Sequence, residues 1–506
     1  MRLPLPTSPG GKMFVAFTLG AASVLGFAPF YLFPLPIITL ALLLYLWNQL
    51  KQRLAAFLVG FAFGLGFFGF GTSWIYVSMH DFGAMPALLA GTATLLFCAL
   101  FALYPALTGS FLAPIKTSPL SKQVLVVPAV WVLLEWTRSW IFTGFPWLAL
   151  GYSQAPLSPL AGYAPLLGVF GVSFFGALSA GLLSLMIGEH ALRKRCVLLL
   201  VAIWLAGFGL KQIEWTQPGG AALEVSLLQG SIPQQLKWRE DQLISSLETY
   251  RRLVDESASQ LIILPETAFP LFYHNVPKIY LEKFTAHAMK NGGDLLIGLP
   301  ERTDKDHYYN SVLSFGGSPT QTYRKSHLVP FGEFIPLRPV FGWLLDVLQI
   351  PLLDFSRGSP EQRPLIVAGQ QVAVNICYED AFGEEVIRQL PQATLLVNFS
   401  NDAWFGNSIA SMQHLQISQM RALEAGRYML RATNTGVTAV INPRGEVLSQ
   451  LPLFTTGSLE HEVWGYGGAT PYVRWGNYAV LLLCVLAIAA NLMLSRRLLS
   501  QAQQNQ

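Results

Sequence analysis

The chain has 506 residues, of which 52% are hydrophobic and only 12% are charged. A typical soluble domain carries roughly 25% charged residues, so the composition excludes an ordinary soluble protein and favours one that crosses a membrane several times. The net charge of +4 is small, and no basic stretch interleaved with aromatic residues occurs, which argues against nucleic-acid binding.

The apolar residues are concentrated in eight windows of near-transmembrane length, about 20 residues for an α-helix that crosses a bilayer. These predicted spans cover residues 13–30, 31–47, 54–77, 85–114, 124–142, 164–187, 196–213 and 478–494. The first window resembles a cleavable signal peptide, but the spans that follow it favour a retained helix.

Charged residues are unevenly distributed, because 46 of the 62 lie in residues 214–475. We therefore predict three parts. Residues 1–213 form a transmembrane region, residues 214–475 form one soluble domain, and residues 476–506 form a final transmembrane helix with a cytoplasmic tail.

Basic residues recur in alternate loops and so orient the chain. With eight spans, one side of the membrane receives Arg2, Lys12, Lys51, Arg53, Lys116, Lys122, residues 193–195, Arg496 and Arg497. The positive-inside rule makes this side cytoplasmic. We therefore expect both termini in the cytoplasm and the soluble domain on the opposite side.

Short apolar strands alternate with helical stretches in the soluble domain. The predicted strands are 223–228, 260–264, 294–298, 309–315, 320–325, 365–367, 371–376, 394–398, 438–442 and 446–448, and the predicted helices are 238–256, 278–291 and 411–431. Continuous apolar runs such as 261–264 are typical of strands buried on both faces, which favours a helix-covered α/β sheet.

Three of the predicted strands end in reactive residues, namely Glu266, Lys325 and Cys377. Ligand sites in open α/β sheets form beyond the carboxyl ends of strands, so these three ends can converge. A carboxylate can take the thiol proton, and an ammonium can stabilise first the thiolate and then an oxyanion. Together the three groups are sufficient for acyl transfer through a thioester.

Each of these residues also has a plain structural interpretation. A lone cysteine after a strand is more often a small buried side chain. Glu266 could cap a helix, and Lys325 could be a solvated loop cation. Cys377 is the only one of four cysteines outside the predicted spans, so a disulfide framework is not expected.

The segments around these residues resemble the nitrilase superfamily in order and spacing. They are Leu264-Pro-Glu-Thr267, Tyr323-Arg-Lys-Ser-His-Leu-Val-Pro-Phe-Gly-Glu333 and Ile376-Cys-Tyr-Glu379. Residues 229–234, 325–333 and 400–405 resemble more specifically the apolipoprotein N-acyltransferase family of bacterial inner membranes. This resemblance extends over essentially the whole chain.

The resemblance implies a polytopic α-helical membrane protein of about eight spans with an extracytoplasmic, periplasmic α/β nitrilase-like αββα sandwich. It implies that Glu266 is the general base, that Lys325 stabilises the tetrahedral oxyanion, and that Cys377 is the nucleophile. It further implies supporting roles for Glu333, Tyr378 and Glu379, and a substrate-facing position on a mobile loop for Trp238.

The same resemblance implies the reaction and its partners. The donor would be a phospholipid, the acceptor would be a diacylglyceryl-modified apolipoprotein, and both would be met at the bilayer of the inner membrane. No cofactor and no metal are expected, since the eight histidines show no ligand spacing, and no nucleic-acid partner is expected.

Two other functions fit parts of the pattern. A membrane-tethered nitrilase-type amidase or hydrolase would use the same three residues with water as the second nucleophile, but would need only one anchor. A transporter or receptor with an external sensor domain would carry polar or charged residues through several spans, but the first, second, sixth and eighth predicted spans contain essentially none.

Overall fold

The computed structural model describes residues 6–304, 307–342 and 354–504. Arg2 and residues 505–506, which belong to the predicted cytoplasmic side, lie outside this set. The chain divides into two compact units, and each is described by itself. Unit 1 comprises Met1–Ser73, Gly91–Ile213 and Trp475–Gln506, and unit 2 comprises Trp74–Ala90 and Glu214–Arg474.

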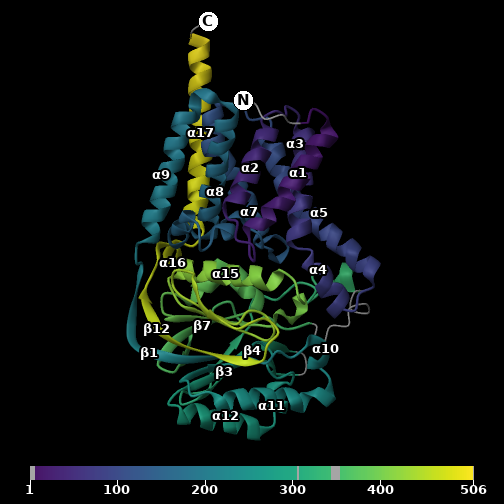
Figure 1. Ribbon diagram of the computed structural model, residues 1–506, viewed down its shortest axis with the longest axis vertical. Helices are drawn as coiled ribbons and strands as arrows, with labels where there is room; N and C mark the ends of the chain where they lie inside the picture. The colour runs from purple at the N-terminus through teal and green to yellow at the C-terminus, as the bar shows by residue number, and fades with distance from the viewer. Residues whose placement is uncertain (1–5, 305–306, 343–353, 505–506) are drawn as a thin grey trace. The chain divides into compact units, whose positions relative to one another are not determined.

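Unit 1 is built of long apolar helices (Figure 1). Its main helices are α1 (Pro9–Ser23), α2 (Pro34–Trp47), α3 (Arg53–Gly71), α5 (Ala87–Leu112), α7 (Val127–Arg138), α8 (Ala164–Gly188), α9 (Arg193–Lys211) and α17 (Tyr478–Gln504). α5 begins in the last residues of the segment assigned to unit 2.

Within the described residues, five helical segments are long and apolar enough to cross a membrane, judged by length and composition. They are Arg53–Gly71, Ala87–Leu112, Pro119–Arg138, Pro159–Gly188 and Tyr478–Arg496. α2 is apolar but shorter, α1 has 15 residues, and α9 opens with three basic residues. The count of eight spans therefore stays a prediction.

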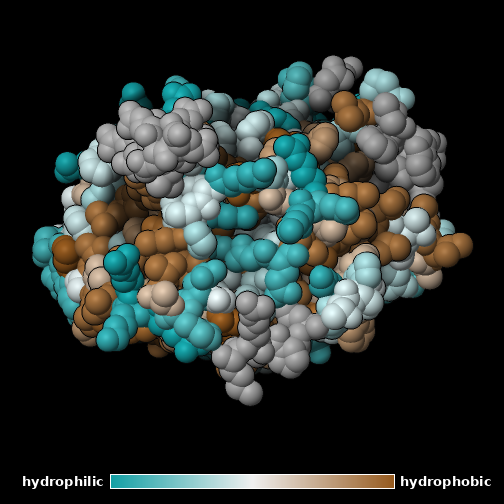
Figure 2. All heavy atoms as spheres, turned by 90° about the horizontal axis from the view of Figure 1, so that it is seen from above, coloured by the Kyte–Doolittle hydropathy of each residue, from teal (hydrophilic) through white to brown (hydrophobic). Residues whose placement is uncertain are grey.

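Small residues allow helices of unit 1 to pack closely. A Cβ atom at Gly20 of α1 would overlap the backbone of Phe63 on α3, and one at Gly66 of α3 would overlap the backbone of Phe17. Such close approach is typical of helices that associate within a bilayer. α1 begins and α17 ends at the same end of unit 1 (Figure 1). The view from above shows patches of hydrophilic side chains between patches of hydrophobic ones (Figure 2).

Unit 2 contains two six-stranded mixed sheets. The first has the order β12-β1-β2-β3-β4-β5 and the second has the order β11-β10-β9-β8-β7-β6. The strands of the first sheet are β1 (Thr216–Gln229), β2 (Leu261–Ile263), β3 (Asp294–Arg302), β4 (Tyr308–Gly316), β5 (Thr322–Arg324) and β12 (Gly457–Gly468). Those of the second are β6 (Leu365–Val367), β7 (Gln370–Ile376), β8 (Leu395–Ser400), β9 (Met429–Thr433), β10 (Ala439–Ile441) and β11 (Val447–Gln450).

Three hydrophobic clusters arrange these sheets as the inner layers of an αββα sandwich. One cluster joins the facing sides of the two sheets, for example Val225 and Ile263 with Val374 and Val397. A second lies between the first sheet and the helices α11 (Glu240–Glu256) and α12 (Lys278–Lys290). The third lies between the second sheet and α15 (Ala410–Ala425), and Figure 1 shows the helices on the outer faces. The two-sheet nitrilase-like fold predicted for this part of the chain is confirmed.

Two elements differ from the expectation. The predicted helix 411–431 is wrong beyond Ala425, because Gly426 adopts φ 62° and ends α15 with a left-handed cap, and Met429–Thr433 then forms the fully buried strand β9. Strand β12 was not predicted, since its sequence contains charged and glycine residues; it is an edge strand that pairs only with the long strand β1.

A segment between two helices of unit 1 belongs to unit 2. This segment, Trp74–Ala90, which we call the strap, begins with α4 (Trp74–Val77). Trp74 Nε1 donates to Gln413 Oε1 of α15 at 3.2 Å, and Ser78 Oγ donates to the carbonyl of Trp404 at 2.8 Å. The strap thus packs on the residues that follow β8 and on the start of α15.

Candidate active site

The three predicted reactive residues follow strands that run in the same direction within their sheets. Glu266 lies three residues after β2, and Lys325 directly follows β5. β2 is parallel to β3, and β4 is antiparallel to both β3 and β5, so β5 runs in the same direction as β2. Cys377 follows β7 directly, and β7 is parallel to its neighbour β8. The strand ends bring these side chains together: Lys325 Nζ lies 3.7 Å from Glu266 Oε1, and the charges of both act on the pKa of the Cys377 thiol.

Lys325 lies at the centre of a buried ion cluster. Its side chain is 1% exposed, and its Nζ lies 2.9 Å from Glu333 Oε2 and 3.7 Å from Glu266 Oε1. Burial lowers the pKa of Lys325, but the charges of Glu333 and Glu266 outweigh it and hold that pKa above its ordinary range. The site therefore contains a permanent ammonium.

Asn310 of β4 joins the two carboxylates of this cluster. Its Nδ2 donates to Glu266 Oε1 at 2.7 Å and to Glu333 Oε1 at 3.0 Å. The backbone amide of Val329 donates to the second oxygen of Glu333 at 2.8 Å. These bonds fix the orientation of both carboxylates, and nothing in the sequence pattern pointed to Asn310.

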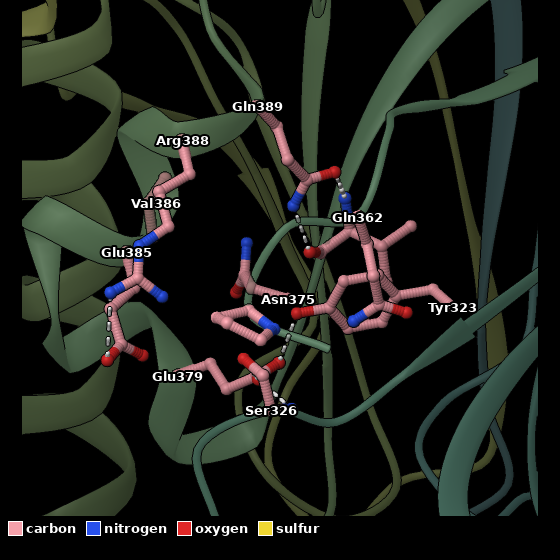
Figure 3. A pocket seen from close by; sticks show the side chains of 11 residues that line it. Tyr323, Ser326, Gln362, Asn375, Glu379, Glu385, Val386, Arg388 and Gln389 are labelled. Carbon is pink, nitrogen blue, oxygen red and sulfur yellow. Dashed lines mark hydrogen bonds and ion pairs between the residues drawn. The ribbon is translucent and has the colours of Figure 1, made fainter. Parts of the chain in front are cut away.

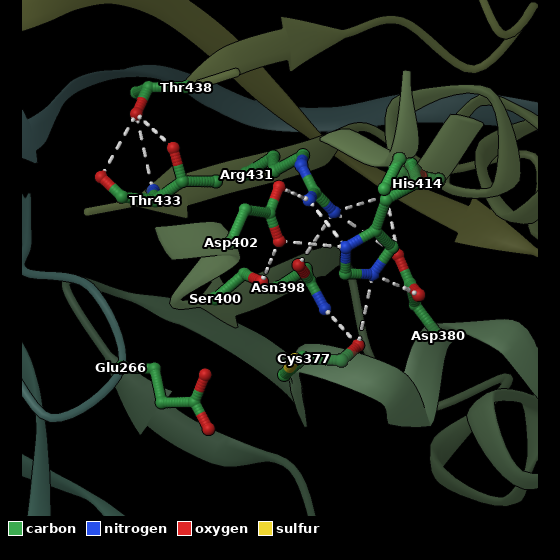
Figure 4. A network of polar contacts seen from close by, with 12 residues as sticks. Glu266, Cys377, Asp380, Asn398, Ser400, Asp402, His414, Arg431, Thr433 and Thr438 are labelled. Atoms are coloured by element: carbon green, nitrogen blue, oxygen red, sulfur yellow. Dashed lines mark hydrogen bonds and ion pairs between the residues drawn. The ribbon is translucent and has the colours of Figure 1, made fainter. Parts of the chain in front are cut away.

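Cys377 adopts a backbone conformation that non-glycine residues rarely take, with φ 53°. Its carbonyl accepts from Asn398 Nδ2 at 3.1 Å, and its sulfur lies on the side that faces Glu266 (Figure 4). Burial and the charge of Glu266 raise the pKa of the thiol well above its usual range, while Lys325 opposes that rise. The thiol is therefore protonated at rest, with a carboxylate placed to take its proton.

Glu379 ties the thiol loop to the loop that carries Lys325. Its Oε1 accepts from the backbone amides of Ser326 and His327 at 2.7 and 3.1 Å, and its Oε2 accepts from the amide of Ile376 at 2.7 Å and from Tyr323 at 3.0 Å. Figure 3 shows Glu379 close to Tyr323 and Ser326. The residue is 2% exposed, and these four hydrogen bonds hold the loop after β5 and the loop after β7 together.

Tyr378 and Trp238 occupy different surroundings. The ring of Tyr378 packs edge-on against Phe382, with centroids 5.0 Å apart. Trp238 is half-buried at the end of α10 (Gln234–Lys237). It directly follows Lys237, whose side chain contacts the carbonyl of Glu266.

Lys237 is a buried cation next to Glu266 that the sequence did not single out. It is 1% exposed, and its Nζ donates to the carbonyl of Glu266 at 3.4 Å. Burial lowers the pKa of Lys237 to about 8, although Glu266 opposes that shift. Lys237 therefore connects α10 to the backbone of Glu266.

A second set of buried charged residues lies behind Cys377 (Figure 4). It contains Asp380, Asp402, His414 and Arg431, all at most 1% exposed. Asp402 belongs to the segment 400–405 that carried part of the family resemblance, which was the one available sequence signal. Asp380 lies in the helical turn Cys377–Ala381, His414 in α15 and Arg431 in β9, and no motif in the sequence pointed to these three.

This geometry suits covalent acyl transfer. A thiol faces a fixed carboxylate, and a permanent ammonium lies beside both, so a carbonyl bound at this place would meet a nucleophile, a proton acceptor and a positive charge. Within residues 6–304, 307–342 and 354–504, no group of three potential ligands is arranged to hold a metal ion.

Comparison with known proteins places both parts of the chain in known families. Residues 19–182 match the apolipoprotein N-acyltransferase N-terminal domain, and residues 224–471 match the carbon-nitrogen hydrolase family.

Three curated relatives, all named apolipoprotein N-acyltransferase, align over nearly their full length. The chain is 58% identical to the one from Nitrosomonas europaea, over 95% of this chain and 96% of that protein. It is 45% identical to the one from Chromobacterium violaceum, over 98% and 96%. It is 43% identical to the one from Methylococcus capsulatus, over 93% and 94%.

Proposed function

The chain belongs to the apolipoprotein N-acyltransferase family, and on that premise we propose that it moves an acyl chain from a phospholipid to a lipoprotein through a thioester on Cys377. The acceptor is the α-amino group of the diacylglyceryl-cysteine at the lipoprotein N-terminus. The observation that carries this proposal is the meeting of the Cys377 thiol with the buried Glu266–Lys325–Glu333 cluster.

In the first half-reaction Cys377 attacks an ester carbonyl of the phospholipid. The S–C bond forms as the thiol proton passes to Glu266, and Lys325 stabilises the tetrahedral oxyanion. The C–O bond then breaks, and the proton held by Glu266 passes to the leaving alkoxide. The products are a lysophospholipid and the thioester.

In the second half-reaction the amine of the acceptor attacks the thioester. Glu266 takes the proton that the amine must lose, the C–N bond forms, and the C–S bond breaks. The proton returns to the sulfur and restores the resting thiol. An amide is more stable than a thioester, so the transfer runs toward the acylated lipoprotein.

Four further residues support this chemistry in the proposal. Glu333 holds Lys325 in place and charged, as their 2.9 Å contact supports. Glu379 and Tyr378 fix the thiol loop. Trp238 contributes to the substrate side of the site from the end of α10.

Both substrates carry acyl chains, which favours a site at the membrane surface. Drawing an acyl chain into water costs about 0.8 kcal/mol for each CH₂ group, so a site at the bilayer surface avoids that cost. We place the catalytic domain on the periplasmic side of the bacterial inner membrane, both termini in the cytoplasm, and the domain limits at residues 213–214 and 475–476. Eight spans, with α1 beginning and α17 ending at one end of unit 1 (Figure 1), suit this arrangement.

The proposal is tested with purified full-length protein in detergent, a phospholipid, and a diacylglyceryl-modified lipopeptide with a free N-terminus. We expect equal amounts of lysophospholipid and N-acylated lipopeptide by mass spectrometry, and no acyl transfer to an N-acetylated lipopeptide. Release of free fatty acid with no lipopeptide product would contradict the proposal and identify a hydrolase.

A further inference from the structure

The nucleophile is held from behind by a histidine. His414 of α15 directs its Nε2 at the carbonyl of Cys377, 3.3 Å away, and at Asp380 Oδ1, 2.9 Å away. Both atoms are acceptors, so this nitrogen must carry a proton. Together with Asn398 it fixes the carbonyl of a residue whose φ of 53° is otherwise unfavourable.

His414 is surrounded by charged groups that act on its pKa in opposite directions. Its Nδ1 lies 3.0 Å from Asp402 Oδ1 and 2.8 Å from Arg431 Nη2. Arg431 also contacts Asp402 at 2.8 Å and Asp380 at 3.5 Å. Two carboxylates therefore face one guanidinium and one imidazole in a fully buried site. Burial and Arg431 lower the pKa of His414, but Asp380 and Asp402 outweigh them and raise it to about 9.

A short chain of contacts connects this cluster to the sulfur. Ser400 Oγ donates to Asp402 Oδ1 at 2.7 Å, and the Ser400 side chain also hydrogen-bonds Cys377 and lowers the pKa of the thiol. The charge of Asp402 raises that same pKa. His414 and Arg431 outweigh burial and hold the pKa of Asp402 below its usual range, so Asp402 stays ionised.

We infer that His414 is a positioning residue for the nucleophile. As an imidazolium it offsets the charge of Asp402 behind the thiol, and through the carbonyl of Cys377 it holds the left-handed backbone that directs the sulfur toward Glu266. Its contact with the nucleophile runs through the carbonyl of Cys377, and no motif in the sequence pointed to this histidine.

Because His414 and Asp402 carry opposite charges, we expect their neutral variants to shift the pKa of the Cys377 thiol in opposite directions. His414→Gln keeps a side-chain amide for the Cys377 carbonyl but removes the positive charge, so the thiol pKa rises. Asp402→Asn keeps an acceptor for Ser400 but removes the negative charge, so the thiol pKa falls. A purely structural role would impair both variants alike.

The test is the rate of Cys377 alkylation by iodoacetamide as a function of pH, in full-length protein in detergent, with the site mapped by peptide mass spectrometry. We expect His414→Gln to slow alkylation at neutral pH about tenfold, the effect of one pKa unit, and Asp402→Asn to accelerate it. The difference between wild type and His414→Gln should close above pH 9, where wild-type His414 loses its proton.

His287→Gln is the matched control, because His287 lies in the same unit but hydrogen-bonds the carbonyl of Ser257 away from the site. Circular dichroism and a thermal transition check that each variant is folded. If His414→Gln does not fold, the test rests on Asp402→Asn, which should alkylate Cys377 faster than the wild type. If the dependence of the alkylation rate on pH is unchanged in the folded variants, or if alkylation is slower in both, the inference is overturned.

The inference deepens the proposed function but is tested separately from it. Alkylation depends on the thiol alone and needs no lipid, so the expected shifts would stand even if acyl transfer were absent. In the transfer assay, His414→Gln should lower kcat and leave the KM for phospholipid unchanged, because His414 does not contact the donor.

Discussion

At the scale of single residues, Lys325 illustrates how burial and charge act against each other. An isolated buried ammonium would lose its proton, but two carboxylates lie beside this one, and Asn310 donates to both of them. The cluster is therefore stable only as a whole, since removing one partner leaves an uncompensated charge in the interior.

The variant Glu333→Gln tests whether the buried cluster depends on each of its charged partners. The variant removes the charge that raises the pKa of Lys325 most, so we expect a loss of up to about 3–5 kcal/mol in the free energy of unfolding and at least about tenfold slower acyl transfer. Chemical denaturation and the lipopeptide assay measure the two effects.

Glu301→Gln is the control for that variant, because Glu301 pairs with the neighbouring Arg324 where both side chains are partly exposed. Such a pair contributes about 0–1 kcal/mol. Equal losses of unfolding free energy and of transfer rate in the two variants would contradict the role of Glu333 in holding Lys325.

The raised pKa of His414 predicts that the stability of the fold depends on pH. Its pKa is raised from 6.5 to about 9 in the fold, so folding is favoured by proton uptake. That contribution is complete below pH 6.5 and is lost as the pH rises to about 9. We expect the Tm of the wild type to fall over this interval more steeply than the Tm of His414→Gln, and parallel curves would refute the assignment of the proton to His414.

At the scale of elements, most strands of unit 2 could be placed from sequence because they are short, continuous apolar runs between polar turns. The predicted runs 260–264 and 371–376 correspond to β2 and β7, which carry Glu266 and Cys377. Strand β9 was hidden because its residues continue the apolar pattern of α15, and only the left-handed Gly426 separates the two elements. Strand β12 was hidden because an edge strand needs no apolar face.

The close packing of β3 against the strand end at Glu266 gives a prediction at this scale. A Cβ atom at Gly298 would lie 2.5 Å from the carbonyl oxygen of Pro265 and 2.7 Å from the Cα of Glu266. Gly298→Ala should therefore displace Glu266, with about 1–3 kcal/mol of destabilisation and, because catalysis tolerates little misplacement, about a hundredfold loss of acyl transfer.

Gly457→Ala on β12 serves as the comparison, because its nearest atom would be at an ordinary distance of 4.0 Å. Both variants are compared by transfer rate and by denaturation. Full activity in Gly298→Ala would show that the position of Glu266 is less strict than its packing suggests.

At the scale of the whole molecule, composition alone distinguished an apolar part from a polar one. The same reasoning could not reveal that the strap, drawn from between two helices of unit 1, belongs to unit 2. Its contacts include hydrogen bonds and ring contacts between residues over 300 positions apart in sequence, such as Trp74 with Gln413 and with Phe405, and no periodic pattern encodes these. The same limit applies to the buried cluster around His414, whose members come from four separate elements.

The proposed orientation can be tested in intact cells. Ser359 is exposed in unit 2, so a Ser359→Cys variant should react with a membrane-impermeant maleimide before the inner membrane is opened. The wild type is the background control for Cys377. Labelling that requires disruption of the inner membrane would place the catalytic domain in the cytoplasm and reverse the topology.

The central claim is that Cys377 carries the acyl chain. Intact-protein mass spectrometry after incubation with phospholipid tests it directly, with Cys377→Ala and Glu266→Gln measured in parallel. We predict one added acyl mass that maps to Cys377, is removed by hydroxylamine, disappears when the diacylglyceryl lipopeptide is added, and is absent from both variants. An adduct on another residue, or transfer that persists in Cys377→Ala, would contradict the thioester mechanism.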